Sequence, residues 1–566
     1  MAERIDLVLM WHMHQPDYRL ADPGGGDEFV LPWTYLHAIK DYTDMAAHLE
    51  RHPAMRAVVN FVPVLLDQLE DYAAQCTRGV LRDPLLRSLG RQDLDAMSLD
   101  ERRALTNACF RSNHKTMLEP YPHYKRLHEL YVRAVAEGDS GLWYFSAGYF
   151  ADLVTWYHLA WCGESERRQR PVIAQLLSKG SGFDHADRLA LLEQIGQIVG
   201  SLIPRYRALA AAGRIELSAT PYAHPLAPLL IDLGCARQAM PDAPLPLAKA
   251  YPGGRTRAAA QVETGRATHA ARFGRPPVGM WPAEGAVSDA FVAMLGEAGC
   301  QWAATSESVL VNSLRLGADA FQSQRAQRLY RPYRVAPTGP ALFFRDERLS
   351  DLIGFEYSRW HGSDAARHFV AELERIADEA PAGEKPIVSV ILDGENAWEY
   401  YPYNGFYFLD HLYEAICACP RIRPTTYAQI LHERDLEPGR IESLVAGSWV
   451  YGTLSTWIGE TEKNRAWDLL CAAKQSYDLV MAGDRLDPGS RAAATAQLAR
   501  CESSDWFWWF GAHNPSHVVQ TFDSLFRANL KQLYRLLGLT LPGALDEPIS
   551  HGGGDPEHGG TMRRAG

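Results

Sequence analysis

The sequence predicts an α/β fold in which seven strands form a closed or nearly closed barrel, with a helical insertion and a helical C-terminal domain. Short apolar segments alternate with helical patterns up to about residue 404, which is typical of a parallel sheet. Polar residues follow directly where several of these apolar segments end. After residue 404 the apolar residues recur at three- and four-residue intervals, which indicates helices.

Seven segments are expected as strands: residues 5–11, 55–61, 214–219, 278–281, 301–305, 341–345 and 387–392. The fourth ends before Pro282, because proline cannot donate a hydrogen bond to a central sheet ladder. The seventh is an almost unbroken apolar run, as expected for a strand that is buried on both faces.

These patterns divide the chain into three parts. Residues 1–404 form the barrel domain, with a helical insertion at about residues 84–200. Residues 405–540 form a C-terminal helical domain that packs on the barrel and completes its site. Residues 541–566 are expected to be a disordered tail, since the Gly-rich stretch from residue 552 has few apolar side chains.

The composition excludes some classes of partner. Of the 566 residues, 47% are hydrophobic and 22% are charged, which is ordinary for a globular protein. The net charge of −11 and the lack of a long basic run argue against nucleic-acid and membrane partners. Several of the 15 Trp and 25 Tyr lie at polar turns, which favours a carbohydrate surface. The nine Cys show no metal-ligand spacing, and no secretory signal or membrane span is seen, so we expect a cytoplasmic protein.

Two carboxylates stand just past expected strand ends. Glu284 follows the strand at residues 278–281, and Asp393 follows the strand at residues 387–392, each with an indole nearby. Active sites of α/β barrels lie at this edge of the sheet. A pair of carboxylates is what glycoside hydrolysis needs, although Glu284 alone could also be a surface residue that caps the next helix.

Five motifs occur in order along the chain. They are residues 12–16 (HMHQP), 213–225 (GRIELSATPYAHP), 280–284 (MWPAE), 393–398 (DGENAW) and 502–509 (ESSDWFWW). On these motifs the chain resembles glycoside hydrolase family 57, whose members act on α-glucans. The resemblance covers nearly the whole chain, from about residue 5 to about residue 530.

The resemblance implies a catalytic (β/α)7 barrel and a retaining mechanism without a cofactor. By position, Glu284 is the nucleophile and Asp393 the general acid/base. The residues HQP, WPAEG and DGENAWE place the chain nearest the amylopullulanase and α-amylase subgroup, and further from the branching enzymes.

Two histidines in the first motif have alternative interpretations. His12 and His14 face the same way on an extended segment and, in the family, contact sugar hydroxyls. The alternative is a metal pair completed by Asp17 or His224. His224 itself is expected either to contact substrate or to make a structural hydrogen bond.

Two further carboxylates are candidates for supporting roles. Glu216 lies inside the third strand and is expected to point into the barrel, where it needs a partner such as His12 or His14. Glu395 is either a sugar contact or a structural residue.

Aromatic residues around the motifs are candidates for sugar stacking. These are Trp33, Trp281, Trp398 and Trp457, together with Trp506 in the fifth motif, while Asp505 beside it is a candidate for binding the substrate. The alternative for the aromatic residues of the fifth motif is packing in the core of the helical domain. We prefer this alternative for Phe507 and for one Trp of the motif.

The leading hypothesis is therefore a retaining enzyme that cleaves α-1,4-glucosidic bonds of starch- or glycogen-type substrates, with α-1,6 bonds as an open alternative. A 4-α-glucanotransferase or branching-type transglycosylase on the same scaffold is the second hypothesis. A metal-dependent α-mannosidase or deacetylase-like enzyme and a non-catalytic α-glucan-binding protein are the remaining alternatives.

Overall fold

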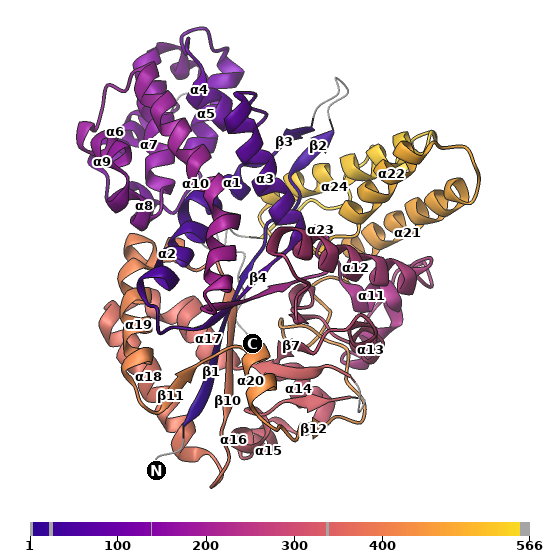
Figure 1. Cartoon of the computed structure of the whole chain (residues 1–566). Helices are drawn as coiled ribbons and strands as arrows, with labels where there is room; N and C mark the ends of the chain where they lie inside the picture. Colours follow the sequence, from indigo (N-terminus) through magenta and orange to yellow (C-terminus); the bar gives the residue numbers. More distant parts are fainter. Residues whose placement is uncertain (1–3, 22–26, 137, 336–338, 555–566) are drawn as a thin grey trace.

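A computed structural model describes residues 4–21, 27–136, 138–335 and 339–554. Its centre is a closed barrel of seven parallel strands in the order β10-β1-β4-β5-β6-β7-β9, with β9 pairing back onto β10 (Figure 1). The strands are β1 (Ile5–Met13), β4 (Ala57–Phe61), β5 (Ile215–Ala219), β6 (Gly279–Met280), β7 (Trp302–Ser306), β9 (Ala341–Arg345) and β10 (Ile387–Asp393).

All seven predicted strands are present, so the α/β barrel is confirmed. Their ends differ from the predicted ones by at most two residues. The difference is two residues for β1 and for β4, and β1 continues to Met13 because His12 and Met13 still pair with β4. β1 and β4 are buried along their whole length, as expected for strands enclosed by helices.

Helices surround this barrel. They are α1 (Trp33–His37), η1 (Ala38–Tyr42) and α2 (Thr43–Arg51) after β1, α3 (Pro63–Arg78) after β4, α12 (Gly254–Phe273), α13 (Asp289–Glu297), α14 (Glu307–Leu314), α18 (Gly362–Glu379) and α19 (Phe406–Ala418). The segment between α3 and β5 is helical, and Figure 1 shows it grouped on one side of the barrel. It contains α4 (Pro84–Gly90), α5 (Leu99–Cys109), α6 (Pro122–Ala134), α7 (Ala147–Trp161), α8 (Glu164–Gln169), α9 (Pro171–Lys179) and α10 (His185–Ala211).

The chain after residue 404 first returns to the barrel. Helix α19 packs against α18, and β11 (Ile422–Pro424) pairs with the start of β1. Helix α20 (Tyr427–Glu433) then crosses the N-terminal end of the barrel, where the Tyr427 ring packs on Trp302 and Phe343. The opposite, C-terminal end of the strands is therefore the open mouth.

The last helices form a separate group beside the barrel (Figure 1). They are α21 (Thr461–Met481), α22 (Pro488–Cys501), α23 (Asp505–Trp509) and α24 (Ser516–Leu536). The disorder expected from residue 541 is not found for residues 541–554, because Leu545, Ile549 and Ser550 are buried. Residues 555–566 of that expected tail lie outside the described residues. Among the described helices, none has the length and apolarity that a membrane span requires.

A buried ion pair joins this helical group to the barrel. Glu502, at the end of α22, is fully buried and accepts hydrogen bonds from Arg257 at 2.7 and 2.8 Å. Tyr251 and Gln261 donate to the same carboxylate at 2.7 and 2.6 Å. Glu502 begins the fifth sequence motif, so that motif is held against the barrel by its first residue.

Replacing Arg257 by Ala is expected to destabilise the fold by about 3–5 kcal/mol, because the buried Glu502 charge loses its partner. The measurement is urea-induced unfolding followed by near-UV circular dichroism. Arg255→Ala is the matched control on the same helix, since Arg255 pairs with Glu297 at the surface and its loss costs at most about 1 kcal/mol. Equal effects of the two substitutions would contradict the structural role of Glu502.

Candidate active site

Glu284 stands on a turn at the barrel mouth. Trp281 continues from β6 by donating its backbone N–H to Ala219 of β5, and Pro282 ends the pairing. Glu284 then takes a left-handed conformation with φ of 59°. Gly285 follows with φ of 58°, and a Cβ there would lie 2.8 Å from the Trp281 ring. A non-glycine residue in this region carries backbone strain, which is common at functional sites.

The Glu284 side chain is buried and held by two donors. Trp449 donates its indole N–H to Oε2 at 3.1 Å, and the Ser504 hydroxyl donates to Oε1 at 3.0 Å. Burial raises the pKa of Glu284 to about 8, helped by the charges of Asp505 and Asp393.

Asp393 ends β10 directly beside His12 of β1, with which it is in register. Gly394 donates its backbone N–H to the His12 carbonyl at 2.7 Å, and a Cβ on Gly394 would clash with Met13. Asn396 donates to the Asp393 carboxylate at 2.8 Å. Burial raises the pKa of Asp393 to about 6, which keeps part of this carboxyl neutral near pH 6.

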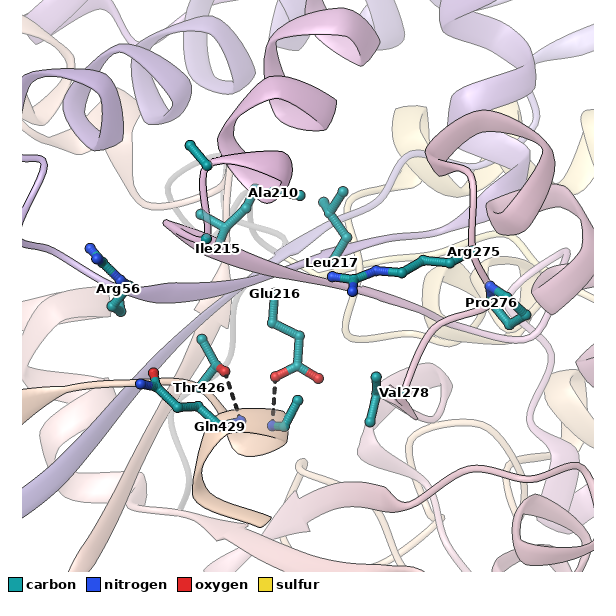
Figure 2. A pocket seen from close by; sticks show the side chains of 13 residues that line it. Arg56, Ala210, Ile215, Glu216, Leu217, Arg275, Pro276, Val278, Thr426 and Gln429 are labelled. Carbon is teal, nitrogen blue, oxygen red and sulfur yellow. Dashed lines mark hydrogen bonds between the residues drawn. The ribbon is translucent and has the colours of Figure 1, made fainter. Parts of the chain in front are cut away.

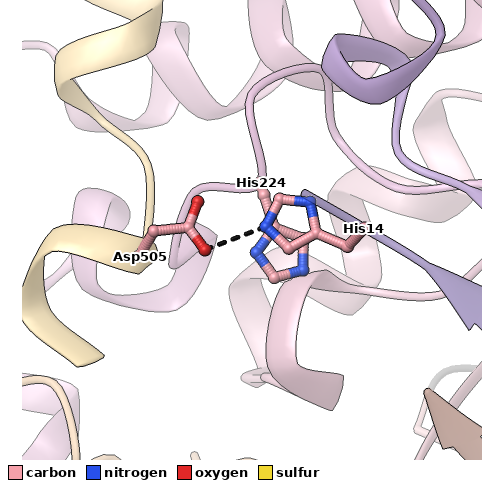
Figure 3. Close-up of side chains that lie close together, drawn as sticks. All are labelled: His14, His224 and Asp505. Carbon is pink, nitrogen blue, oxygen red and sulfur yellow. Dashed lines mark hydrogen bonds and ion pairs between the residues drawn. The ribbon is translucent and has the colours of Figure 1, made fainter. Parts of the chain in front are cut away.

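The rings of His14 and His224 stack on each other beside Asp505 (Figure 3). The ring centroids of His14 and His224 lie 3.8 Å apart with planes inclined by 19°. His14 donates Nε2–H to Asp505 at 2.9 Å, and His224 contacts Ser504 through Nδ1 at 2.8 Å. With Glu284 ionised, the hydrogen bonds run from His224 to Ser504 and from Ser504 to Glu284.

His12 lies next to this stack, and its ring centroid is 5.3 Å from that of His224. Its Nδ1 donates to the Asn60 carbonyl oxygen at 2.7 Å, so Nε2 is left as the acceptor. Burial and the neighbouring His14 lower the pKa of His12 to about 3, so the ring is neutral. The structure thus brings His12, His14 and His224 together near both carboxyls.

The structure places His14 and His224 of the metal alternative in one cluster, but Asp505 takes the place expected for His12. One ligand atom from each of His14, His224 and Asp505 lies within 4.8 Å of the others. Asp17, the other candidate ligand, is instead paired with Arg19 at 2.7 Å and Arg500 at 2.9 Å. Asp17 is therefore not available to a metal at this cluster.

Glu395 is buried behind the first motif. Its Oε1 accepts hydrogen bonds from the His14 backbone, from Gln15 and from Tyr42 at 3.0, 3.3 and 3.1 Å. Burial and the charge of Asp393 raise its pKa well above the ordinary value. These contacts match the structural role considered for Glu395, which is to fix the segment that carries His14.

Glu216 does not belong to this site. It points into the barrel as predicted, but its partners are the Trp302 indole at 2.7 Å and the Ala428 N–H at 2.9 Å, rather than His12 or His14. The reason is its position: Glu216 is the second residue of β5 and lies near the N-terminal end of the barrel. A cavity of about 440 Å³ lies there and is also lined by Arg56 and Arg275 (Figure 2).

Four of the predicted stacking indoles are core residues. Trp281, Trp398, Trp457 and Trp506 are at most 1% exposed, so they have no face to offer a sugar. Trp398 and Trp506 also donate their indole N–H groups to backbone carbonyls, at 2.8 and 2.9 Å. Trp33 is half-buried on α1 and packs on Trp161, with 5.8 Å between ring centroids.

Three further residues belong to the site. Trp449 is half-buried, contacts Glu284 and lies 5.3 Å from the Trp281 ring. Ser504 links Glu284 to His224, and Asn60 orients His12. Ser504 lies in the fifth motif beside Asp505, so its position in that motif could have identified it as a site residue.

The closed barrel and the carboxyl pair at its mouth define a barrel enzyme of the glycosidase type. The sequence profile of Glycosyl hydrolase family 57 matches residues 8–442, and the chain belongs to this family. The chain is therefore a glycoside hydrolase, and the sequence-based resemblance is confirmed. Comparison with curated protein sequences gives no match.

Several solved structures share the fold. A branching enzyme from Thermococcus kodakaraensis is 17% identical, with 95% of this chain and 90% of that chain covered and a TM-score of 0.59. A branching enzyme from Pyrococcus horikoshii is 16% identical, with 95% and 90% covered and a TM-score of 0.57. The α-amylase AmyC from Thermotoga maritima is 13% identical, with 94% and 93% covered and a TM-score of 0.56. At these identities the likeness shows the fold alone.

Proposed function

We propose that this enzyme cleaves α-1,4-glucosidic bonds with retention of configuration, using Glu284 as nucleophile and Asp393 as general acid/base. The observation that carries the proposal is the pair of buried carboxyls with raised pKa values at one barrel mouth. The α-glucan substrate is supported by the names of the solved structures that share the fold, namely two branching enzymes and an α-amylase.

The proposed reaction has two steps. Asp393 protonates the glycosidic oxygen while Glu284 attacks the anomeric carbon, which releases the leaving chain and forms a glycosyl ester. Asp393, now ionised, takes a proton from water or from a sugar hydroxyl that attacks the same carbon. Glu284 leaves as a carboxylate, which Trp449 and Ser504 stabilise by donating hydrogen bonds.

The histidines suit the recognition of sugar hydroxyls. His12 presents Nε2 as an acceptor, and neither Nδ1 of His14 nor Nε2 of His224 has a hydrogen-bond partner within the described part of the chain. Buried polar atoms are normally paired, so these atoms are ready to contact a ligand. Trp449 is the half-buried indole that lies nearest to Glu284 in this network and suits stacking on the sugar ring.

The pKa of the proposed nucleophile, Glu284, is higher than that of the proposed general acid/base, Asp393. The higher value belongs to Glu284, so the proton that the pair shares resides there, whereas the first step needs it on Asp393. Positive charge that develops on the anomeric carbon stabilises the ionised form of Glu284. A glycosidic oxygen beside Asp393 favours its protonated form, so substrate binding moves the proton to the position that catalysis requires.

We expect a bell-shaped dependence of kcat/KM on pH, with its maximum between about pH 6 and pH 8. Below the pKa of Asp393, about 6, both carboxyls become protonated and the nucleophile is lost. Above the pKa of Glu284, about 8, both become ionised and the acid is lost. Initial rates on maltoheptaose at low substrate concentration, measured from pH 4 to about pH 10, test this profile. A single ionisation across this range would contradict the shared proton.

Transfer to a sugar acceptor is the second candidate function. It is favoured by the fold shared with the two branching enzymes. The same glycosyl ester serves both outcomes, because only the molecule that Asp393 deprotonates in the second step differs. The α-amylase and amylopullulanase subgroup suggested by the motifs remains our preferred assignment.

Product analysis on maltoheptaose and pullulan separates these functions. Hydrolysis predicts only shorter maltooligosaccharides, and α-1,6 cleavage adds maltotriose from pullulan. Longer products, or new branch points in amylose, would show transfer. A chelator is expected to leave all rates unchanged, because no step uses a metal. Loss of activity on chelation would instead favour a metal held by His14, His224 and Asp505.

A further inference from the structure

A second cluster of ligand-type side chains lies between α2 and α19, which contact each other on the outer side of the barrel (Figure 1). His48 is on α2, His52 directly follows the last residue of α2, and Asp410 is on α19. One ligand atom from each lies within 4.8 Å of the others. A spacing of four residues brings two side chains to the same side of a helix, as in helical zinc motifs.

His48 lacks the partners that a buried imidazole needs. It is 1% exposed, and neither of its ring nitrogens has a hydrogen-bond partner among the residues that the structure describes. The rings of Phe406 and Tyr413 pack around it, with centroids 5.1 and 6.4 Å from that of His48. Burial without a partner is costly for a polar group, so this ring is suited to a ligand.

The other two members leave a route to solvent. His52 Nε2 lies 2.7 Å from Asp410 Oδ1, and the two side chains are 18% and 26% exposed. Arg51 also contacts Asp410, at 2.6 Å, and its side chain is 36% exposed. Because the Arg51 side chain is long and partly in water, it can leave the carboxylate when another cation takes its place.

We propose that His48, His52 and Asp410 bind a divalent transition-metal ion of the Zn²⁺ type, which clamps α2 to α19. Two imidazole nitrogens and one carboxylate oxygen form a ligand set that zinc prefers, and the open side leaves room for a water molecule as fourth ligand. The site is separate from His14, His224 and Asp505. Its expected effect is on stability, because the ion joins the helix that follows β1 to a helix late in the barrel.

The test is titration of the chelator-treated full chain with Co²⁺, followed by its visible absorption, and with Zn²⁺, followed by calorimetry. We expect one site that His52→Ala and Asp410→Asn each weaken by about 100-fold or more. His224→Ala, which breaks the other cluster, should leave this site intact. His432→Ala is the matched control, because His432 is an exposed residue in the last turn of a helix.

Arg51→Gln is expected to change the affinity for Zn²⁺ in the opposite direction. Removing the guanidinium from Asp410 should tighten the binding of Zn²⁺, whereas adventitious binding to surface histidines would not respond. Zn²⁺ should raise the melting temperature of the wild type and not that of His52→Ala, while turnover of both on maltoheptaose stays equal. Equal Zn²⁺ affinity of the wild type, His52→Ala and Asp410→Asn would overturn the proposal, as would loss of the site in His224→Ala.

Discussion

Glu284→Gln is expected to lower kcat on maltoheptaose by a factor on the order of 10⁴ or more, as found when a nucleophile is removed from other enzymes. The amide cannot form the glycosyl ester, so the double displacement stops at its first step. Folding stability should be retained, because Gln keeps the size of the side chain and can still accept the Trp449 indole N–H. The measurements are kcat and the melting temperature.

Glu216→Gln is the matched control for this substitution. Glu216 is also a buried glutamate of the barrel with a raised pKa, but it lies at the closed end and is bound to Trp302 and Ala428. Its replacement should leave kcat of the folded enzyme within a few-fold of the wild type. Near-normal turnover of Glu284→Gln, or equal losses in both variants, would refute the assignment of the nucleophile.

Asp393→Asn is expected to show an effect that depends on the leaving group. With α-glucans the leaving sugar needs a proton, so a general acid that contributes 10²–10⁴-fold is lost, and about that factor should disappear from kcat/KM. An aryl α-maltoside with a nitrophenolate leaving group needs no proton, so its kcat/KM should fall much less. The second step remains slow, because no base activates the water.

Azide distinguishes the two carboxyl roles. It needs no base, so it should restore turnover of Asp393→Asn on the aryl maltoside and give a glycosyl azide of retained configuration. In Glu284→Ala the same anion would occupy the face of the nucleophile and give the inverted azide. Inverted product from Asp393→Asn would mean that the roles of Glu284 and Asp393 are exchanged.

The barrel could be predicted because each strand carries its own local pattern. Apolar runs such as residues 387–392 are short, and the residues at their ends mark the barrel mouth. Glu284 and Asp393 could be found in the same way, since each directly follows such a run. His12 lies at the end of β1, and His14 and His224 follow β1 and β5, which explains why all three meet at the mouth.

Contacts between distant segments could not be predicted from those patterns. Ser504 meets Glu284 across 220 residues of sequence, and Trp449 meets it across 165. The role of the indoles could not be predicted either. A Trp next to a motif is as well suited to packing in the core beneath the site as to stacking on a sugar, and Trp398 packs in the core. The predicted contact of Glu216 with His12 or His14 was wrong because of its position along β5. Its side chain points into the barrel, but it lies near the N-terminal end, whereas the histidines lie at the mouth.

The fifth motif has a consequence for biosynthesis. Ser504 and Asp505, which contact Glu284 and His14, follow all seven barrel strands in the sequence, so the ribosome makes them after the barrel. A nascent barrel that already contains Glu284 and Asp393 lacks these contacts until the C-terminal helices have emerged and docked through Glu502. The complete set of contacts thus forms only after these helices have docked, and a chain truncated by a premature stop codon before residue 502 would lack the contacts of Ser504 and Asp505 with Glu284 and His14.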